Sequence, residues 1–252
     1  MRFFNLLRNI NNWWDYIFYK IGISKKYPII FKCNNNVIVE VPKRLLHTFK
    51  EVFFDDFYIK YISPSQLKNQ PVNILDIGAN TGYFSLLMFA KHPKSKIIAF
   101  EPIPENYELL QKHKAMNSAK DFTIVNKAVY GDSGNIKLQY NSEDSFTTGA
   151  SVFNNTLGND EIEVETITLP EIIDTYKLNT IQILKMDCEG AEYNIFYNCP
   201  EKYFSYIRYI ALECHNGETK KENITALCDF LKSKGYFVET SNSGMLWAWR
   251  NI

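Results

Sequence analysis

Four ionisable side chains lie just after two apolar stretches of the chain and could move a proton. Asp187 and Glu189 follow the first stretch, and Glu213 and His215 close the second. Parallel strands end at the same edge of a sheet, so these side chains should converge there. A histidine has the intrinsic pKa of a general base near neutral pH, and a carboxylate can position it or a reacting hydroxyl. Asp187, Glu189, Glu213 and His215 are therefore candidate catalytic residues.

The same cluster offers ligands for a divalent cation. Asp187, Glu213 and His215 would supply oxygen and nitrogen atoms suited to Mg²⁺ or Mn²⁺, and a bound metal would lower the pKa of an acceptor hydroxyl. The spacing permits a metal, but no compact motif requires one. Glu189 and Glu192 fall in the first turn of a predicted helix, where acids offset the helix dipole. We expect Glu189 to face the site and Glu192 to be structural, while His215 could also be a rim histidine bonded to the backbone.

A second pair of strand ends, earlier in the chain, points to a nucleoside-bearing cofactor. Residues 72–82 (VNILDIGANTG) indicate a buried strand that ends in an acid and turns on glycines into a helix. Residues 99–102 (AFEP) end another strand in an acid. Gly78 and Gly82 would let the backbone approach the cofactor closely. Glu101 lies 19 residues after Gly82, where a ribose-binding acid belongs.

The glycine pattern argues against a dinucleotide. A dinucleotide fingerprint needs a glycine where Asn80 stands, so that the turn can approach a pyrophosphate. Asp76 would repel a pyrophosphate but could hold a cationic amino group. The loop resembles motif I of the S-adenosylmethionine (SAM)-dependent methyltransferases, whose cofactor has an amino acid end and no phosphate. The other interpretation is a tight strand-to-helix turn without a ligand.

The motif I resemblance assigns the parts of SAM to these strand ends. The residues expected around the methionine end are Asp76, Gly78, Ala79, Asn80 and Gly82. Glu101 is expected on the ribose hydroxyls. Pro102, Asn126 and Ala128 are expected along the adenine, although a strand-end alanine is most often only packing.

The elements that must position these residues alternate from Val72 onward. Strands are expected at 72–77, 96–101, 122–126, 181–187, 207–213, 236–240 and 245–249. Helices are expected at 81–91, 104–117, 169–176, 190–198 and 219–234. This alternation indicates an α/β fold with a mostly parallel sheet and helices on both faces. A Ser-Asn-Ser-Gly turn between the last two strands is a hairpin signal, which makes the final strand antiparallel.

An insertion separates the third and fourth parallel strands. Alternating stretches near 136–140 and 162–166 predict two strands that flank the polar segment 141–160. A loop of this length is either functional or mobile, and we favour a substrate loop over the crevice.

Residues 1–70 are expected to form an N-terminal appendage, a lid or docking element, to a methyltransferase-like domain at 71–252. Residues 1–23 carry apolar side chains at helical spacing, which predicts an amphipathic helix. Polar residues interrupt it, so it suits neither a membrane span nor a signal peptide. The helix could pack on its own domain, on a second subunit or on a membrane surface, in that order, because a membrane-surface helix usually carries more Lys and Arg. Residues 29–41 are expected to form a hairpin around three asparagines.

The composition limits the compartment and the partners. The 28 basic and 28 acidic residues cancel, so no charge excess favours nucleic acid as a substrate. The five cysteines include no C-x-x-C pair, which argues against a disulfide framework or a zinc site and favours the reducing cytoplasm. The 252 residues, 46% of them hydrophobic, suit one large core with a small appendage.

Several motifs together resemble the FkbM family of SAM-dependent methyltransferases. They are DIGANTGYFS at 76–85, AFEPIPENYELL at 99–110, KAVYGDSGNIKL at 127–138, GASVF at 149–153, VETITLPEII at 164–173, ILKMDCEGAE at 183–192 and ALECHN at 211–216. The D-x-E-G-x-E and E-x-H motifs in combination are more specific than motif I alone. The resemblance implies a Rossmann-like class I methyltransferase sheet. It also implies O-methylation of a hydroxyl on a sugar, polysaccharide precursor or natural product.

Other functions stay open at this point. The acceptor could present a nitrogen or a phosphorus-linked group instead of a hydroxyl. The chain could also be a catalytically silent scaffold that binds a partner through its aromatic N-terminal helix, although the acids and His215 are intact. A nicotinamide-dependent oxidoreductase is disfavoured by the missing middle glycine. A nucleic-acid methyltransferase is disfavoured by the neutral charge and by Asp-Cys-Glu-Gly at 187–190, in place of an Asn-Pro-Pro-Tyr-like segment.

Overall fold

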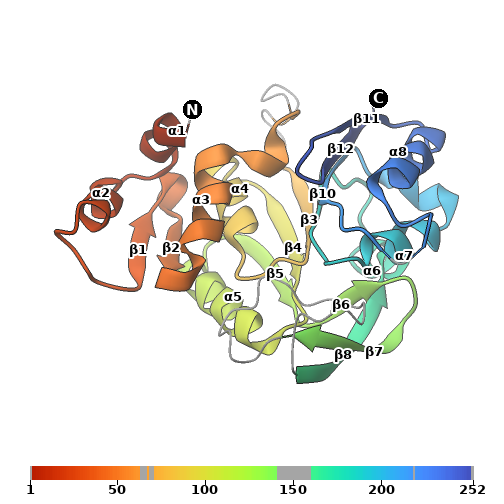
Figure 1. The fold of residues 1–252 in the computed structure, drawn as a ribbon, viewed down its shortest axis with the longest axis horizontal. Coiled ribbons are helices and arrows are strands. Elements are labelled where there is room, and N and C mark those ends of the chain that lie inside the picture. Colours follow the sequence, from red (N-terminus) through yellow and green to blue (C-terminus); the bar gives the residue numbers. More distant parts are fainter. Residues whose placement is uncertain (1, 63–66, 68–70, 141–159, 218, 251–252) are drawn as a thin grey trace.

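The fold is built on a seven-stranded sheet, seen here in a computed structural model that describes residues 2–62, 67, 71–140, 160–217 and 219–250 (Figure 1). The strands are β3 (Asn73–Ile77), β4 (Lys96–Phe100), β5 (Asp121–Val125), β9 (Ile183–Met186), β10 (Tyr209–Glu213), β11 (Phe237–Thr240) and β12 (Met245–Trp249). Their order is β11-β12-β10-β9-β3-β4-β5. Adjacent strands from β5 to β10 are parallel, and β12 is antiparallel to both of its neighbours. The predicted class I methyltransferase sheet with its reversed last strand is confirmed.

Helices cover both faces of this sheet, as predicted. The helices on one face are α3 (Leu46–Asp55), α4 (Tyr83–Lys91) and α5 (Pro104–Met116), and those on the other are α6 (Leu169–Thr175), α7 (Glu192–Tyr197) and α8 (Ile224–Ser233). Each face has its own cluster of buried apolar side chains. The last helix begins five residues later than the predicted 219, because the Asn223 side chain accepts the Ala226 N–H at 3.0 Å and caps it there.

The insertion after β5 forms a separate three-stranded sheet. Its strands are β6 (Ala128–Tyr130), β7 (Gly134–Tyr140) and β8 (Asp160–Thr168), in the order β6-β8-β7. Both predicted strands of the insertion are confirmed. Residues 141–159, which make up nearly all of the predicted substrate loop, lie outside the described residues.

The N-terminal segment contains a hairpin and two short helices. The predicted hairpin is confirmed as β1 (Ile29–Lys32) paired with β2 (Ile38–Val41). The single helix predicted over 1–23 is wrong, because the chain forms α1 (Arg2–Asn9) and α2 (Trp14–Lys20). Between them, Ile10 forms a β-bridge with Cys33, and this pairing to the hairpin interrupts the helix. In the part of the chain that the structure describes, no helix has the length and apolar character to cross a membrane.

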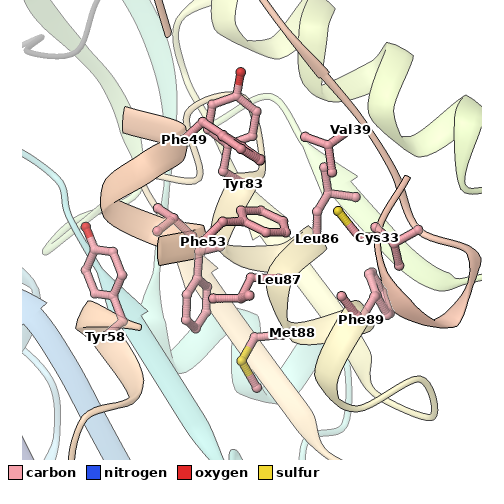
Figure 2. Close-up of a cluster of buried hydrophobic side chains, with 14 of the residues drawn as sticks. Cys33, Val39, Phe49, Phe53, Tyr58, Tyr83, Leu86, Leu87, Met88 and Phe89 are labelled. Atoms are coloured by element: carbon pink, nitrogen blue, oxygen red, sulfur yellow. The ribbon is translucent and has the colours of Figure 1, made fainter. Parts of the chain in front are cut away.

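The N-terminal segment shares the core of the sheet domain. Figure 2 shows Phe49 and Phe53 of α3 beside Tyr83 and Leu86 of α4. The Phe49 ring lies 4.6 Å from that of Phe53 and 5.5 Å from that of Tyr83, measured between centroids. A boundary at residue 70 stays a prediction, but the residues before it pack as a layer of this core.

Candidate active site

The candidate site consists of two adjoining cavities at the carboxyl ends of the central strands. The first is lined from β3, β4, β6 and β7, and the second from α3, α4, β9 and β10. Asn80, Asp187 and Glu189 line both cavities. This is the edge of a parallel sheet at which small ligands bind in this architecture. The shared residues place the junction of the two cavities beside the predicted catalytic cluster.

Glu101 is the anionic centre of the first cavity. Its carboxylate accepts the N–H of Asn80 at 2.7 Å and the N–H of Ile103 at 3.0 Å, and the Asn106 amide donates at 3.3 Å. Burial raises the pKa of this carboxyl to about 7, against the opposing effect of these hydrogen bonds. The structure therefore fixes one carboxylate where the sequence predicts a ribose partner.

The predicted cofactor residues separate into lining and supporting positions. Those that line the first cavity are Gly78, Asn80, Glu101, Pro102 and Ala128, and Ala79 lines the second. Asp76, Gly82 and Asn126 line neither. The Asn126 amide donates to the carbonyls of Glu101 at 2.8 Å and Pro102 at 3.0 Å, so it supports the turn that follows β4.

The two motif glycines are required by packing inside the protein. A Cβ on Gly78 would lie 1.8 Å from the Asp187 carbonyl oxygen, and one on Gly82 would lie 2.6 Å from Leu110 Cδ1. Both glycines also have positive φ, at 68° and 87°. The sequence argument attributed them to close approach of the cofactor. In the structure, Gly78 also allows the ends of β3 and β9 to touch, and Gly82 allows α4 to meet α5. Close approach of the cofactor at these glycines stays a prediction.

Lys185, which the sequence analysis did not single out, lies beneath both cavities. Its ammonium donates to the Gly78 carbonyl at 2.6 Å and lies 3.4 Å from Asp76 Oδ1 and 3.8 Å from Asp187 Oδ2. Burial by itself lowers the pKa of this lysine, but Asp76 and Asp187 raise it above its usual range. Asp76 is fully buried and also accepts the Ser85 hydroxyl at 2.7 Å. Asp76 thus holds a lysine of the protein, where the sequence analysis expected the cofactor's amino group.

Tyr58 joins the N-terminal segment to the predicted catalytic cluster. It lies in the 3-10 turn η3 (Phe57–Ile59), and its hydroxyl donates to Asp187 Oδ2 at 3.0 Å. Burial raises the pKa of Tyr58, so the hydroxyl keeps its proton and can donate. The second cavity also has Thr48 and Glu51 of α3 in its wall. No local pattern in the sequence indicates these contacts, because Tyr58 and Asp187 are 129 residues apart.

His215 lies between two carboxylates. Its Nε2 is 3.2 Å from Glu189 and its Nδ1 is 3.3 Å from Glu192. Burial alone would lower its pKa, but the hydrogen bond to Glu192 and the charge of Glu189 raise the pKa to about 9. The imidazole therefore carries a proton at neutral pH, and His215 lines neither cavity. Glu192 is fully buried and accepts the backbone N–H groups of Gly190 and His215, which is a structural role.

Glu189 is the carboxylate of this cluster that lies between the cavities and the histidine. It has a positive φ of 51°, which turns the backbone between β9 and α7. Burial raises its pKa to about 7, while the charge of His215 opposes the shift. Glu213 lines the second cavity, and burial together with Asp187 raises its pKa. Burial thus shifts both carboxyls toward accepting a proton, and for Glu189 the pKa lies near neutral pH.

A divalent cation has a candidate ligand set in this cluster. Asp187, Glu189 and His215 each offer a ligand atom, all within 4.8 Å of one another. The sequence analysis named Glu213 in place of Glu189. Two carboxylates and one imidazole suit Mg²⁺ or Mn²⁺.

Comparisons with known proteins find one matching family and several relatives. A family model described as "Methyltransferase FkbM domain" matches residues 76–238. The chain is 28% identical to methyltransferase sdnD of Sordaria araneosa, covering 75% of this chain and 80% of that protein. It is 22% identical to 31-O-demethyl-FK506 methyltransferase FkbM of Streptomyces tacrolimicus, covering 75% and 81%. The precorrin-6y C5,15-methyltransferase structure from Geobacter metallireducens GS-15 aligns with a TM-score of 0.43 and 17% identity, over 74% of this chain and 85% of that one.

Proposed function

Because the chain belongs to the methyltransferase FkbM family, we propose that it transfers a methyl group from SAM to a hydroxyl on a sugar, polysaccharide precursor or natural product. The observation that carries this proposal is the meeting of two cavities at Asp187 and Glu189. One cavity suits a nucleoside, and the other leaves room for an acceptor beside two proton-accepting groups.

The first cavity fits the nucleoside part of SAM. Its described lining includes apolar side chains for a base, such as Ile103, Ala128 and Leu138, and Glu101 for the ribose diol. No lysine or arginine is among the described lining residues, so the cavity offers no side-chain cation to a pyrophosphate. This composition supports a nucleoside that carries no phosphate.

The second cavity fits the charged end of SAM and an acceptor. Its wall includes Glu51, Asp187, Glu189 and Glu213, and its one described cation is Lys185, which is paired with acids. These carboxylates suit the cofactor's ammonium group and repel a phosphorylated acceptor. The alternative of a phosphorus-linked acceptor is therefore disfavoured.

The residues at the junction divide the chemical tasks. SAM, when bound, supplies a methyl group that its sulfonium already activates. The protein must then place the acceptor oxygen in line and remove its proton. We assign proton removal to Glu189, because its pKa of about 7 suits a base and it lines both cavities. His215, protonated and 3.2 Å from Glu189, positions that carboxylate. Asp187, held by Tyr58, positions the acceptor hydroxyl.

Calorimetric titration with SAM, its demethylated product and NAD tests the cofactor first. We expect micromolar binding of the first two ligands and none of NAD. A screen of unphosphorylated sugars, glycans and polyhydroxylated natural products for methyl transfer follows, with amines as the N-methylation arm. The name of the Streptomyces relative denotes an O-demethyl substrate, which supports a hydroxyl group as the methyl acceptor. Absence of SAM and product binding would favour a silent scaffold.

A divalent metal at Asp187, Glu189 and His215 is a separate proposal. A bound cation would hold the acceptor oxygen and lower its pKa. Activity should then be lost in EDTA and restored by Mg²⁺ or Mn²⁺. Full activity in EDTA would assign the proton transfer to the side chains alone.

The cytoplasm is the proposed compartment. All five cysteines are free thiols, which supports a reducing environment. Labelling of the thiols in cells with a membrane-impermeant reagent tests this placement. A cytoplasmic protein should be labelled only after lysis.

A further inference from the structure

The first helix buries Leu6 together with two asparagines and leaves Phe4 and Leu7 exposed to solvent. Asn5 and Asn9 are buried, and their side-chain amides donate to the carbonyls of Phe54 and Phe53, each at 2.8 Å. Phe4, by contrast, is 68% exposed. The polar asparagines face the protein, where their amides are hydrogen-bonded, and the aromatic Phe4 faces solvent. Such an arrangement indicates that an apolar partner covers this surface.

The second helix has the same orientation. Trp14, Phe18 and Ile21 recur at the spacing of one helix side, and all three are exposed. Trp13 and Ile17 pack against the core. The predicted apolar stripe of residues 1–23 is therefore divided, because Ile10 and Ile17 pack on the chain's own domain while Trp14, Phe18 and Ile21 are exposed.

Positive charge accompanies these side chains. Residues 1–30 contain five basic residues and one acid, Asp15, in a chain whose total charges cancel. Arg8, Lys20, Lys25 and Lys26 are exposed. We define the N-terminal face as Phe4, Leu7, Arg8, Trp14, Phe18, Lys20, Ile21, Ile23, Lys25 and Lys26. Figure 1 shows α1 and α2 at the end of the molecule farthest from α8.

We propose that the N-terminal face docks on the surface of an anionic phospholipid bilayer. Aromatic and aliphatic side chains next to lysines and arginines are the combination that holds a helix in the headgroup region. A second copy of the chain would bring a face of the same positive charge, which opposes self-association. Attraction of the basic residues to the anionic headgroups adds to the contribution of the apolar side chains.

This face is remote from the chemistry. The described lining of the two active-site cavities includes no residue before Thr48. Docking would therefore leave the site open and concentrate the enzyme near acceptors made at the membrane. The inference stands whether or not the proposed reaction is correct, because it rests on residues outside both cavities.

Vesicle flotation of the full-length protein tests the proposal. Vesicles of phosphatidylcholine alone are compared with vesicles of an equimolar mixture of phosphatidylcholine and phosphatidylglycerol, at low and high salt. We expect flotation with the mixed vesicles, weakened by salt, and little with phosphatidylcholine alone. The double variant Trp14→Ser/Phe18→Ser should reduce partitioning about tenfold, because it removes two aromatic rings that would be buried in the bilayer. Lys25→Glu/Lys26→Glu should reduce it by a similar factor.

Matched controls separate docking from general effects. Phe237→Ser removes an aromatic side chain that is 56% exposed on β11, and Lys220→Glu reverses an exposed charge, both outside the N-terminal face. Neither should change partitioning. No flotation of the wild type, or equal loss in the controls, would overturn the proposal. A dimer by light scattering that dissociates in Trp14→Ser/Phe18→Ser, without vesicle binding, would identify the face as an interface between copies.

Discussion

Glu101 and Asp187 occupy equivalent places at two strand ends of one sheet, yet the structure holds them in different ways. Glu101 is fixed by the backbone N–H groups of Asn80 and Ile103, which belong to the loops beside it. Asp187 is fixed by two side chains. These are Tyr58, which precedes the first strand of the sheet in the sequence and offers its hydroxyl, and Lys185, which offers its ammonium group. The hydrogen bonds of Glu101 thus come from backbone of nearby loops, whereas Asp187 is held in part by a side chain 129 residues away. We call the first cavity the nucleoside half of the site and the second cavity the acceptor half, after their proposed ligands.

This difference predicts different kinds of failure. A change in the nucleoside half should alter ligand affinity and little else, because its hydrogen bonds come from main chain that remains in place. A change in the acceptor half should affect stability or turnover, because Asp187 is held by the side chains of Tyr58 and Lys185.

Lys185→Met should have the largest effect. It leaves the fully buried carboxylate of Asp76 and the partly exposed carboxylate of Asp187 without their cation, which should lower the free energy of unfolding by about 3–5 kcal/mol. Urea denaturation followed by circular dichroism measures this loss. The double variant Asp76→Asn/Lys185→Met should recover part of it. Unchanged stability in Lys185→Met would show that the lysine is not the counter-charge of the acceptor half.

His215→Gln should reduce turnover about a hundredfold while SAM affinity stays nearly constant. Wild-type activity should rise with pH through about 7, as Glu189 loses its proton. The imidazolium lowers the pKa of Glu189, so its removal should move this rise to higher pH. His92→Gln, a histidine outside the site, serves as the control. Equal losses of turnover and SAM affinity would make His215 a structural residue.

Glu101→Gln should weaken SAM binding about tenfold, because a charged acceptor for the ribose hydroxyls is lost. Wild-type affinity should fall as the pH drops below about 7 and Glu101 becomes protonated, and the variant should lack this dependence. Titration calorimetry across pH measures both effects. Glu108→Gln, which changes an exposed carboxylate on α5, is the control. A variant with wild-type affinity would remove Glu101 from the cofactor site.

Tyr58→Phe should have the smallest effect, about fivefold in turnover, because one hydrogen bond to Asp187 is lost and the ring stays. SAM affinity should not change. Steady-state kinetics of Tyr58→Phe and of the control variant Tyr61→Phe, which changes an exposed tyrosine nearby, measure this effect. A larger loss of SAM affinity than of turnover would place Tyr58 in the nucleoside half.

The same local and distant division explains what the sequence could predict. Strand ends at Asp76, Glu101, Asp187 and Glu213 follow from periodicity, since each acid closes an apolar run. The role of Lys185 could also have been predicted, because a charged residue inside the apolar strand Ile-Leu-Lys-Met needs a buried partner of opposite charge. Tyr58 left none, because its partner is determined only by tertiary packing.

Periodicity also misjudged the N-terminal helix for a physical reason. A pattern of apolar residues at helical spacing identifies a side of the helix but not what covers it. Here the carbonyls of Phe53 and Phe54 select Asn5 and Asn9 for the buried side. The backbone pairing of Ile10 with Cys33 then ends the helix, and no local propensity encodes that pairing.

The wall that Thr48, Glu51 and Tyr58 give to the second cavity has an evolutionary consequence. These residues precede residue 76, where the match to the family model begins. The cavity proposed for the acceptor is therefore lined partly from outside the stretch that the family shares. Under the proposed function, relatives that differ in this leading stretch should differ in the acceptors they methylate.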